Sequence, residues 1–128
     1  MTRRHTRVRG VTLIKTASEL IAEAQARISC LDVPAAKTLY DQSENAVIID
    51  VREADSAAAS KLGDSVNISR GLIEMKVPKL CANPDTLILT HCGGGGRASL
   101  AALTLQEMGY ANVHAITAKF EEIKSAFG

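Results

Sequence analysis

The sequence predicts an α/β protein of three layers, in which helices cover both faces of a central, mostly parallel sheet of about five strands. Two apolar runs, Ala46–Asp50 and Thr86–Thr90, have the composition of strands buried on both faces, as parallel sheets require. Segments with apolar residues at helical spacing alternate with these strands. The chain has 128 residues, the length of one domain, and its 46% apolar and 23% charged residues are typical of a globular protein.

The first half of the chain is expected to begin with two helices. The first follows Ser18, which has the side chain of an N-cap and precedes apolar residues at helical spacing through Ile28. The second runs from Asp32 through Gln42, because an aspartate with a proline close behind it is typical of a helix start. Three residues of this second helix are expected to face the core: Ala35, Leu39 and Tyr40.

The second half of the chain contains the longest expected helix, from Ala98 to Met108. It is expected to end at Gly109, since glycine readily adopts the left-handed conformation with which many helices close. Further helices are expected over 53–62, 71–80 and 118–127, and further strands over 28–31, 65–68 and 112–116.

The charge of the chain is unevenly distributed. The net charge is +1, but four arginines give +4 to the first ten residues, which leaves 11 basic and 14 acidic residues, or −3, for the rest. Residues 1–16 are therefore expected to form a basic, flexible arm before a single domain over 17–128. No nucleic-acid motif accompanies the arginines, and no apolar run approaches the roughly 20 residues of a membrane span or forms a signal peptide. Neither nucleic acid nor membrane is expected as a partner, and the expected location is the cytoplasm.

The chain has three cysteines, and an odd number without close pairing argues against a disulfide framework. There is no Cys-x-x-Cys pair and the histidines are not at ligand spacing, so no metal site is expected. Cys30 and Cys81 are expected to be small buried or half-buried apolar residues. Cys92 is not expected to be a simple apolar residue, because the residues that follow it in sequence suit a reactive thiol.

Cys92 begins a loop in which four glycines separate it from Arg97, between a buried strand and a helix. Each glycine costs about 0.5–1 kcal/mol where alanine would fit, so four together indicate a backbone that needs positive φ or close approach. Their amides are expected to form an anion-binding nest, to which the helix N-terminus and Arg97 add positive charge. A reactive thiolate is therefore expected at Cys92, with Arg97 as its catalytic partner. The amides that would bind substrate belong to Gly93, Gly94, Gly95 and Gly96.

Other polar residues are expected at the same edge, because ligands of parallel sheets bind at the carboxyl ends of the strands. Asp50 and Arg52 end the neighbouring strand and are expected to brace the loop through a charge-assisted hydrogen bond or an ion pair. The alternative is an ordinary surface pair worth less than about 1 kcal/mol. His91 is expected to point away from Cys92, since side chains alternate along a strand, and His114 is expected to be a half-buried strand residue.

The loop and its frame resemble the rhodanese-like sulfurtransferases, whose active-site loop has the form Cys-x4-Arg at the end of a central strand. The resemblance runs from about residue 18 to about residue 126 and includes four quoted segments: Ile48–Glu53, Ser65–Gly71, Ala98–Gly109 and Tyr110–His114. It implies a single-domain rhodanese fold and a thiosulfate sulfurtransferase-like enzyme.

In the reaction that the resemblance implies, Cys92 takes a sulfane sulfur from a small donor, which is thiosulfate, a mercapto acid or a persulfide. The resulting persulfide, held by the glycine amides and Arg97, gives its sulfur to a thiol, to cyanide or to a protein. No metal or organic cofactor is required.

Two alternatives remain open at this point. A Cys-dependent phosphatase has a similar loop, but with five residues between cysteine and arginine, and the four residues here form a ring that suits one sulfur atom better than a phosphate. The second alternative is a non-catalytic or regulatory binding module on the same scaffold. It is kept because residues Ser60–Ser65 and Ala118–Lys119, expected at the mouth of the site, depart from the family's usual Gly-His-Ile-Pro-Gly-Ala and Gly-Gly.

Overall fold

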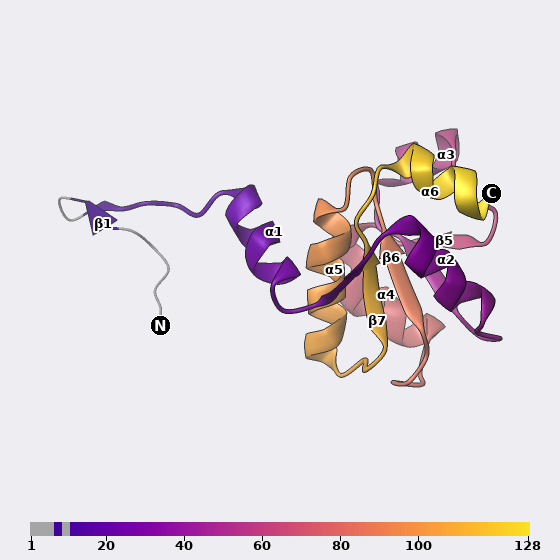
Figure 1. Ribbon diagram of the computed structural model, residues 1–128. Helices are drawn as coiled ribbons and strands as arrows, with labels where there is room; N and C mark the ends of the chain where they lie inside the picture. Colours follow the sequence, from indigo (N-terminus) through magenta and orange to yellow (C-terminus); the bar gives the residue numbers. More distant parts are fainter. Residues whose placement is uncertain (1–6, 9–10) are drawn as a thin grey trace.

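The computed structural model describes residues 7–8 and 11–128. Two short strands, β1 (Arg7–Val8) and β2 (Val11–Thr12), pair antiparallel, and the chain then leads to helix α1 (Ala17–Gln25) (Figure 1). The expected arm, residues 1–16, lies partly outside the described residues, and its flexibility stays a prediction. None of the helices in the described ranges is long and apolar enough to cross a membrane.

The centre of the molecule is a five-stranded sheet in the order β3-β7-β6-β4-β5, and each neighbouring pair is parallel. This arrangement confirms the predicted α/β fold class. Valine and isoleucine dominate the inner strands, as expected for strands covered on both faces. The strands are β3 (Ser29–Leu31), β4 (Val47–Asp50), β5 (Ser65–Asn67), β6 (Ile88–His91) and β7 (Val113–Ile116).

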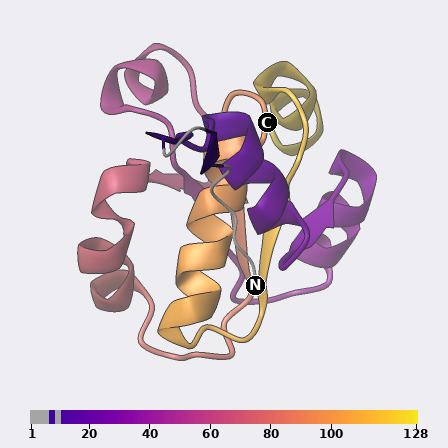
Figure 2. The same ribbon diagram turned by 90° about the vertical axis from the view of Figure 1, so that its left-hand side faces the viewer.

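Helices form a layer on each face of this sheet (Figure 1). One layer contains α4 (Ile73–Leu80) and α5 (Gly96–Met108), and the other contains α2 (Val33–Asp41) and α6 (Phe120–Phe127). Helix α3 (Ala54–Ala59) and the 3-10 turn η1 (Arg70–Leu72) belong to the connections on either side of β5. Helix α1 packs on α5 rather than on the sheet, and Figure 2 shows it lying across α5.

Alternation along the inner strands divides the core into two parts. Ile49 of β4 and Ile88 of β6 pack with α4 and α5, whereas Ile48 and Leu89 pack with α2 and α6. The same alternation continues past the end of β6, so that His91 and Cys92 lie on opposite sides of the sheet. This confirms that His91 points away from Cys92.

Several predicted boundaries were wrong by one or two residues. The N-cap of α1 is Thr16 rather than Ser18, because Thr16 and Glu19 form a capping box in which each side chain accepts the other's amide hydrogen. The N-cap of α2 is Asp32, as predicted, and its carboxylate accepts the amide of Ala35. In this helix Ala36, rather than Ala35, is the fully buried alanine.

Two of the cysteines, Cys81 and Cys30, differ in their exposure to solvent. Cys81 is buried, as predicted, at the end of α4. Cys30 is exposed, which contradicts the prediction, and it belongs to β3, an edge strand of the sheet. Gly109 closes α5 with φ 112°, as predicted.

Candidate functional site

The candidate site lies where the two central strands end side by side. Asp50 of β4 is paired in register with His91 of β6, and the chain turns from His91 through a loop into α5. Cys92 is the first residue of this loop and is only 2% exposed, packed in the core on the α5 side. The topology therefore brings the predicted nucleophile and the predicted supporting pair to the same edge of the sheet.

The sulfur of Cys92 accepts two backbone hydrogen bonds. The amide of Gly95 lies 3.0 Å from Sγ and the amide of Ala98 lies 3.4 Å from it. Gly95 is the N-cap of α5 and Ala98 is in its first turn, so Sγ occupies the place where a capping side chain accepts the free amides of a helix start. This environment of N–H donors and positive helix end favours negative charge on the sulfur.

The four glycines of the loop have different roles. Gly95 has φ 102°, and an added Cβ would lie 3.1 Å from Cα of Thr117, so this position requires glycine. Gly96 allows a close approach of helix α1, since an added Cβ would lie 2.8 Å from Cδ1 of Ile21. Gly93 and Gly94 are exposed, with open space where a side chain would be. Of the predicted four amides, that of Gly95 donates to Sγ.

Sequence reasoning missed the amide of Ala98 as a donor to Cys92. A signal was present, because a helix that starts directly after a loop leaves its first amides free, and the third residue of that helix is the usual donor to a capping group. Thr90 of β6 supports the same residue, since its hydroxyl donates to the carbonyl of Ala98 over 2.8 Å.

Arg97 lies at the outer rim of the loop. Its side chain is 46% exposed, and Nη1 is 4.0 Å from Oε2 of Glu53, which is itself 70% exposed. This is a loose, solvent-exposed ion pair that contributes little to stability. The guanidinium of Arg97 is thus open to solvent at the rim of the loop.

Asp50 and Arg52 form a buried ion pair, unlike the exposed pair considered as the alternative. The two residues are 0% and 7% exposed, and the guanidinium donates to both oxygens of the carboxylate at distances of 2.8–3.2 Å. Burial alone would raise the pKa of Asp50, but the hydrogen bonds from the side chain and the amide of Arg52 outweigh it and lower the pKa. Arg52 also donates to the carbonyl of Ser60 over 2.6 Å, which fixes the end of α3.

The link between this pair and the loop passes through Phe120. The guanidinium carbon of Arg52 lies 3.9 Å from the centre of the Phe120 ring, and the amide of Phe120 donates to the carbonyl of Gly93 over 3.1 Å. Among the described residues, the hydrogen bonds of Asp50 and Arg52 do not reach the loop itself. Bracing by this pair is thus indirect, and sequence reasoning missed Phe120 because only the fold brings α6 to the loop.

His91 completes the stack on the far side of the sheet from Cys92. Its ring lies on that of Phe120, with centroids 6.0 Å apart, and neither ring nitrogen has a hydrogen-bond partner among the described residues. Burial lowers the pKa of His91 against the opposing effect of Asp50, so the ring is neutral near pH 7. His91 contributes packing beneath the loop rather than a base for Cys92. His114 is half-buried, as predicted.

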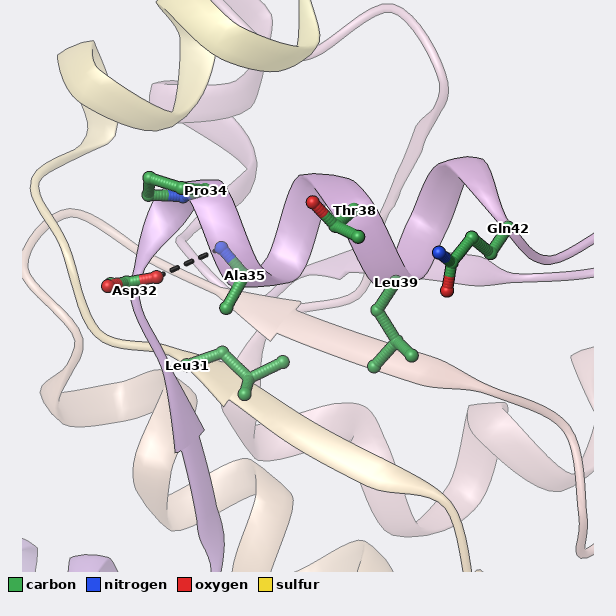
Figure 3. Close-up of a pocket in the computed structure, with 7 residues that line it drawn as sticks. All are labelled: Leu31, Asp32, Pro34, Ala35, Thr38, Leu39 and Gln42. Carbon is green, nitrogen blue, oxygen red and sulfur yellow. Dashed lines mark hydrogen bonds between the residues drawn. The ribbon is translucent and has the colours of Figure 1, made fainter.

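A groove elsewhere on the surface is separate from this site. It runs along α2 at the β3 edge and is lined by the seven residues drawn in Figure 3: Leu31, Asp32, Pro34, Ala35, Thr38, Leu39 and Gln42. All of these residues precede β4, so the groove includes no part of the Cys92 loop. Within the described part of the chain, no group of three or more His, Cys, Asp or Glu side chains could hold a metal ion.

Solved structures resemble this one over most of its length. A Rhodopseudomonas palustris protein of unknown function, described as a possible tyrosine phosphatase, is 26% identical, with a TM-score of 0.79 over 92% of this chain and 96% of its own. A polysulfide-sulfur transferase homodimer from Wolinella succinogenes is 24% identical, with a TM-score of 0.67 over 80% and 77%. A human single-domain sulfurtransferase is 21% identical, with a TM-score of 0.62 over 73% and 92%. The two sulfurtransferases are similar enough to show the fold.

A comparison with curated proteins found no match. The sequence model of the rhodanese-like domain, in contrast, matches residues 35–126, which include β4, the Cys92 loop and α5. This match spans well over half of the chain and agrees with the sulfurtransferase folds among the similar structures. The chain belongs to the rhodanese-like domain family.

Proposed function

We propose that this protein is a sulfurtransferase that carries a sulfane sulfur on Cys92. The observation that carries the proposal is the pair of amide hydrogen bonds from Gly95 and Ala98 to the Cys92 sulfur at the start of α5. Such donors stabilise a thiolate before the reaction and a persulfide anion after it, with no metal or organic cofactor. Membership of the rhodanese-like family supports the same chemistry. A cytoplasmic location, where thiols are kept reduced, suits an enzyme of this kind.

The proposed reaction has two steps. In the first, the Cys92 thiolate attacks the outer sulfur of a donor, such as thiosulfate or a low-molecular-weight persulfide. A bond forms between Sγ and that sulfur, the sulfur–sulfur bond of the donor breaks, and sulfite or a thiolate leaves with the electron pair. With a mercapto acid such as 3-mercaptopyruvate, the carbon–sulfur bond breaks instead, and the enolate of pyruvate leaves with the electron pair. In the second step an acceptor thiolate or cyanide attacks the outer sulfur, and Cys92 leaves as the thiolate. Arg97 is proposed to attract the anionic donor and to help hold the persulfide.

A phosphatase is the second candidate, because the Rhodopseudomonas palustris protein described as a possible tyrosine phosphatase is similar to this chain over nearly its whole length. The loop argues for sulfur. Four residues separate Cys92 from Arg97, and the amides of Gly95 and Ala98 already converge on Sγ itself. A phosphoryl group would need donors to three further oxygens around that sulfur.

Intact-mass measurement after incubation with a panel of donors tests the proposal. The panel contains thiosulfate, 3-mercaptopyruvate and glutathione persulfide, and the variants are Cys92→Ser and, as a matched control, Cys30→Ser. Cys30 is the exposed cysteine, so its variant reports non-specific modification. We expect wild type and Cys30→Ser to gain one sulfur atom that a thiol acceptor removes, and Cys92→Ser to gain none.

The alternatives give different results in the same samples. If wild type takes no sulfur from any donor but hydrolyses p-nitrophenyl phosphate in a Cys92-dependent way, the phosphatase is correct. If neither reaction occurs, the domain is a binding or regulatory module on the rhodanese scaffold.

A further inference from the structure

We propose that Gln25 and Ser99 are positioning residues that hold Gly95 where its amide stabilises the Cys92 sulfur. Helix α1, which contains Gln25, then contributes to the reactivity of Cys92. This inference rests on the proposed function for its role in turnover. Its structural basis is a set of hydrogen bonds that joins α1 to the loop.

The hydrogen bonds run from the surface to the sulfur. The side-chain amide of Gln25 in α1 donates to Oγ of Ser99 over 3.0 Å, and the hydroxyl of Ser99 donates to the carbonyl of Gly95 over 2.7 Å. The amide of Gly95 in turn donates to Sγ of Cys92 over 3.0 Å. Both the carbonyl and the amide of Gly95 are thus engaged, which fixes the two peptide units on either side of its Cα.

Gln25 favours the direction in which these hydrogen bonds run. The hydroxyl of Ser99 has one hydrogen to donate, and Ser99 is fully buried in α5. The carbonyl of Gly95 also accepts the backbone amide of Ser99 over 3.0 Å, as residue i−4 of a helix does. The amide donor of Gln25 at Oγ favours this carbonyl as the acceptor of the hydroxyl hydrogen. Gly95 adopts its φ of 102° without strain because glycine has no Cβ, and the same freedom leaves many other conformations open to it, so the hydrogen bonds select the observed orientation of its two peptide units.

Helix α1 also touches the loop directly. The side chain of Ile21 occupies the space over Gly96 that a Cβ would fill, and Figure 2 shows α1 lying across α5. Helix α1 (Ala17–Gln25) lies outside residues 35–126, the part of the chain that matches the rhodanese-like domain. The match to the rhodanese-like domain therefore does not include this contact.

Four variants and one control test the proposal. Gln25→Ala removes the donor, Ser99→Ala removes the relay, and the double variant tests whether they act together. Gln25→Glu puts a carboxylate where the amide was, which accepts the Ser99 hydrogen and draws it away from Gly95. The control is Gln106→Ala, because Gln106 also joins α5 to the α1 end of the chain, by donating to the carbonyl of Arg27 over 3.0 Å, but has no path to Gly95.

Two rates are measured for each folded variant. The first is alkylation of Cys92 by iodoacetamide between pH 5 and 9, resolved by peptide mass, with exposed Cys30 as internal reference. The second is the single-turnover rate of persulfide formation at saturating donor. We expect Gln25→Ala to slow both at neutral pH by about two- to tenfold, the worth of one hydrogen bond, with the donor KM unchanged. Gln25→Glu is expected to slow both more, and to move the alkylation profile to higher pH.

The double variant gives the sharpest outcome, because Gln25→Ala is expected to have no further effect once Ser99 is alanine. The inference is overturned if the two losses multiply, if Gln106→Ala slows Cys92 as much as Gln25→Ala does, or if Gln25→Ala leaves both rates unchanged. If wild type forms no persulfide, the proposed function fails, and the alkylation rates alone then decide whether Gln25 and Ser99 position the sulfur.

Discussion

Replacing Gly95 by alanine is expected to damage both the loop and its reactivity, while the same change at its neighbours is not. Gly95 has φ 102°, a conformation that alanine rarely adopts. The added Cβ would lie 3.1 Å from Cα and 3.4 Å from Cβ of Thr117, and a backbone atom cannot move aside as the end of a side chain can. The amide that would be displaced is one of the two that donate to Cys92 Sγ.

The size of the effect follows from these contacts. A residue forced into such a backbone region costs about 1–3 kcal/mol, and relief of the contact with Thr117 requires a shift of the loop. Loss of the Gly95 hydrogen bond would slow persulfide formation by about 10- to 150-fold, since a hydrogen bond to a charged group is worth about 1.5–3 kcal/mol.

Urea denaturation of Gly95→Ala, Gly93→Ala and Gly94→Ala, combined with the single-turnover sulfur-transfer rate, measures both effects. Gly93 and Gly94 have open space for a Cβ and are not among the glycines with positive φ. These two variants are expected to keep the wild-type rate and to be unchanged or more stable by up to about 1 kcal/mol, because alanine restricts the unfolded chain. The reasoning is wrong if Gly95→Ala is as stable and as fast as Gly94→Ala.

Three further predictions concern the residues around the loop. Asp50→Asn leaves Arg52 buried without its partner and is expected to cost about 3–5 kcal/mol near pH 7 in urea denaturation. Because the pKa of Asp50 is lowered in the folded protein, its contribution to the free energy of unfolding is lost as the pH falls below about 4. The Asp50→Asn variant should lack this loss, and a variant whose stability falls below pH 4 as steeply as that of wild type contradicts the assignment. Burial lowers the pKa of His91, so this histidine is protonated at a higher pH in the unfolded chain than in the folded protein, and the free energy of unfolding of wild type should fall as the pH drops below about 6.5. His91→Leu should flatten this fall, and a variant whose stability changes with pH as that of wild type does would refute the prediction. Arg97→Gln, at an exposed position, should change stability by less than about 0.5 kcal/mol but slow sulfur transfer from anionic donors, and an unaltered rate removes Arg97 from the proposed site.

The fold could be predicted from local patterns because each pattern has a physical cause that acts within a few residues. The apolar runs that became β4 and β6 are buried on both faces, and Gly109 ends α5 in the left-handed conformation. The start of α1 was misplaced because Ser18 and Thr16 both have capping side chains, and the reciprocal bonds with Glu19 favour Thr16. Exposure of Cys30 was missed because the burial of a side chain on an edge strand depends on packing against distant segments, which the sequence pattern does not specify.

The candidate site likewise has a part that could be predicted from the sequence and a part that could not. Cys92, its loop and Arg97 are contiguous in sequence, so their spacing could be read directly, and the ends of β4 and β6 meet as parallel strands must. Contacts between distant segments could not be predicted. Phe120, between Arg52 and the carbonyl of Gly93, and Gln25, at the hydroxyl of Ser99, are brought to the loop only by the packing of α6 and α1.

The central claim is that the sulfur of Cys92, held by the amides of Gly95 and Ala98, accepts and releases a sulfane sulfur. Its most direct test is peptide-resolved mass spectrometry of the wild-type protein after incubation with thiosulfate, 3-mercaptopyruvate or glutathione persulfide. The account predicts one added sulfur on the Cys92 peptide, lost on addition of a thiol acceptor, with Cys81 unmodified. Wild-type protein that stays unmodified at Cys92 with every donor, or that takes up sulfur only at exposed Cys30, would contradict it.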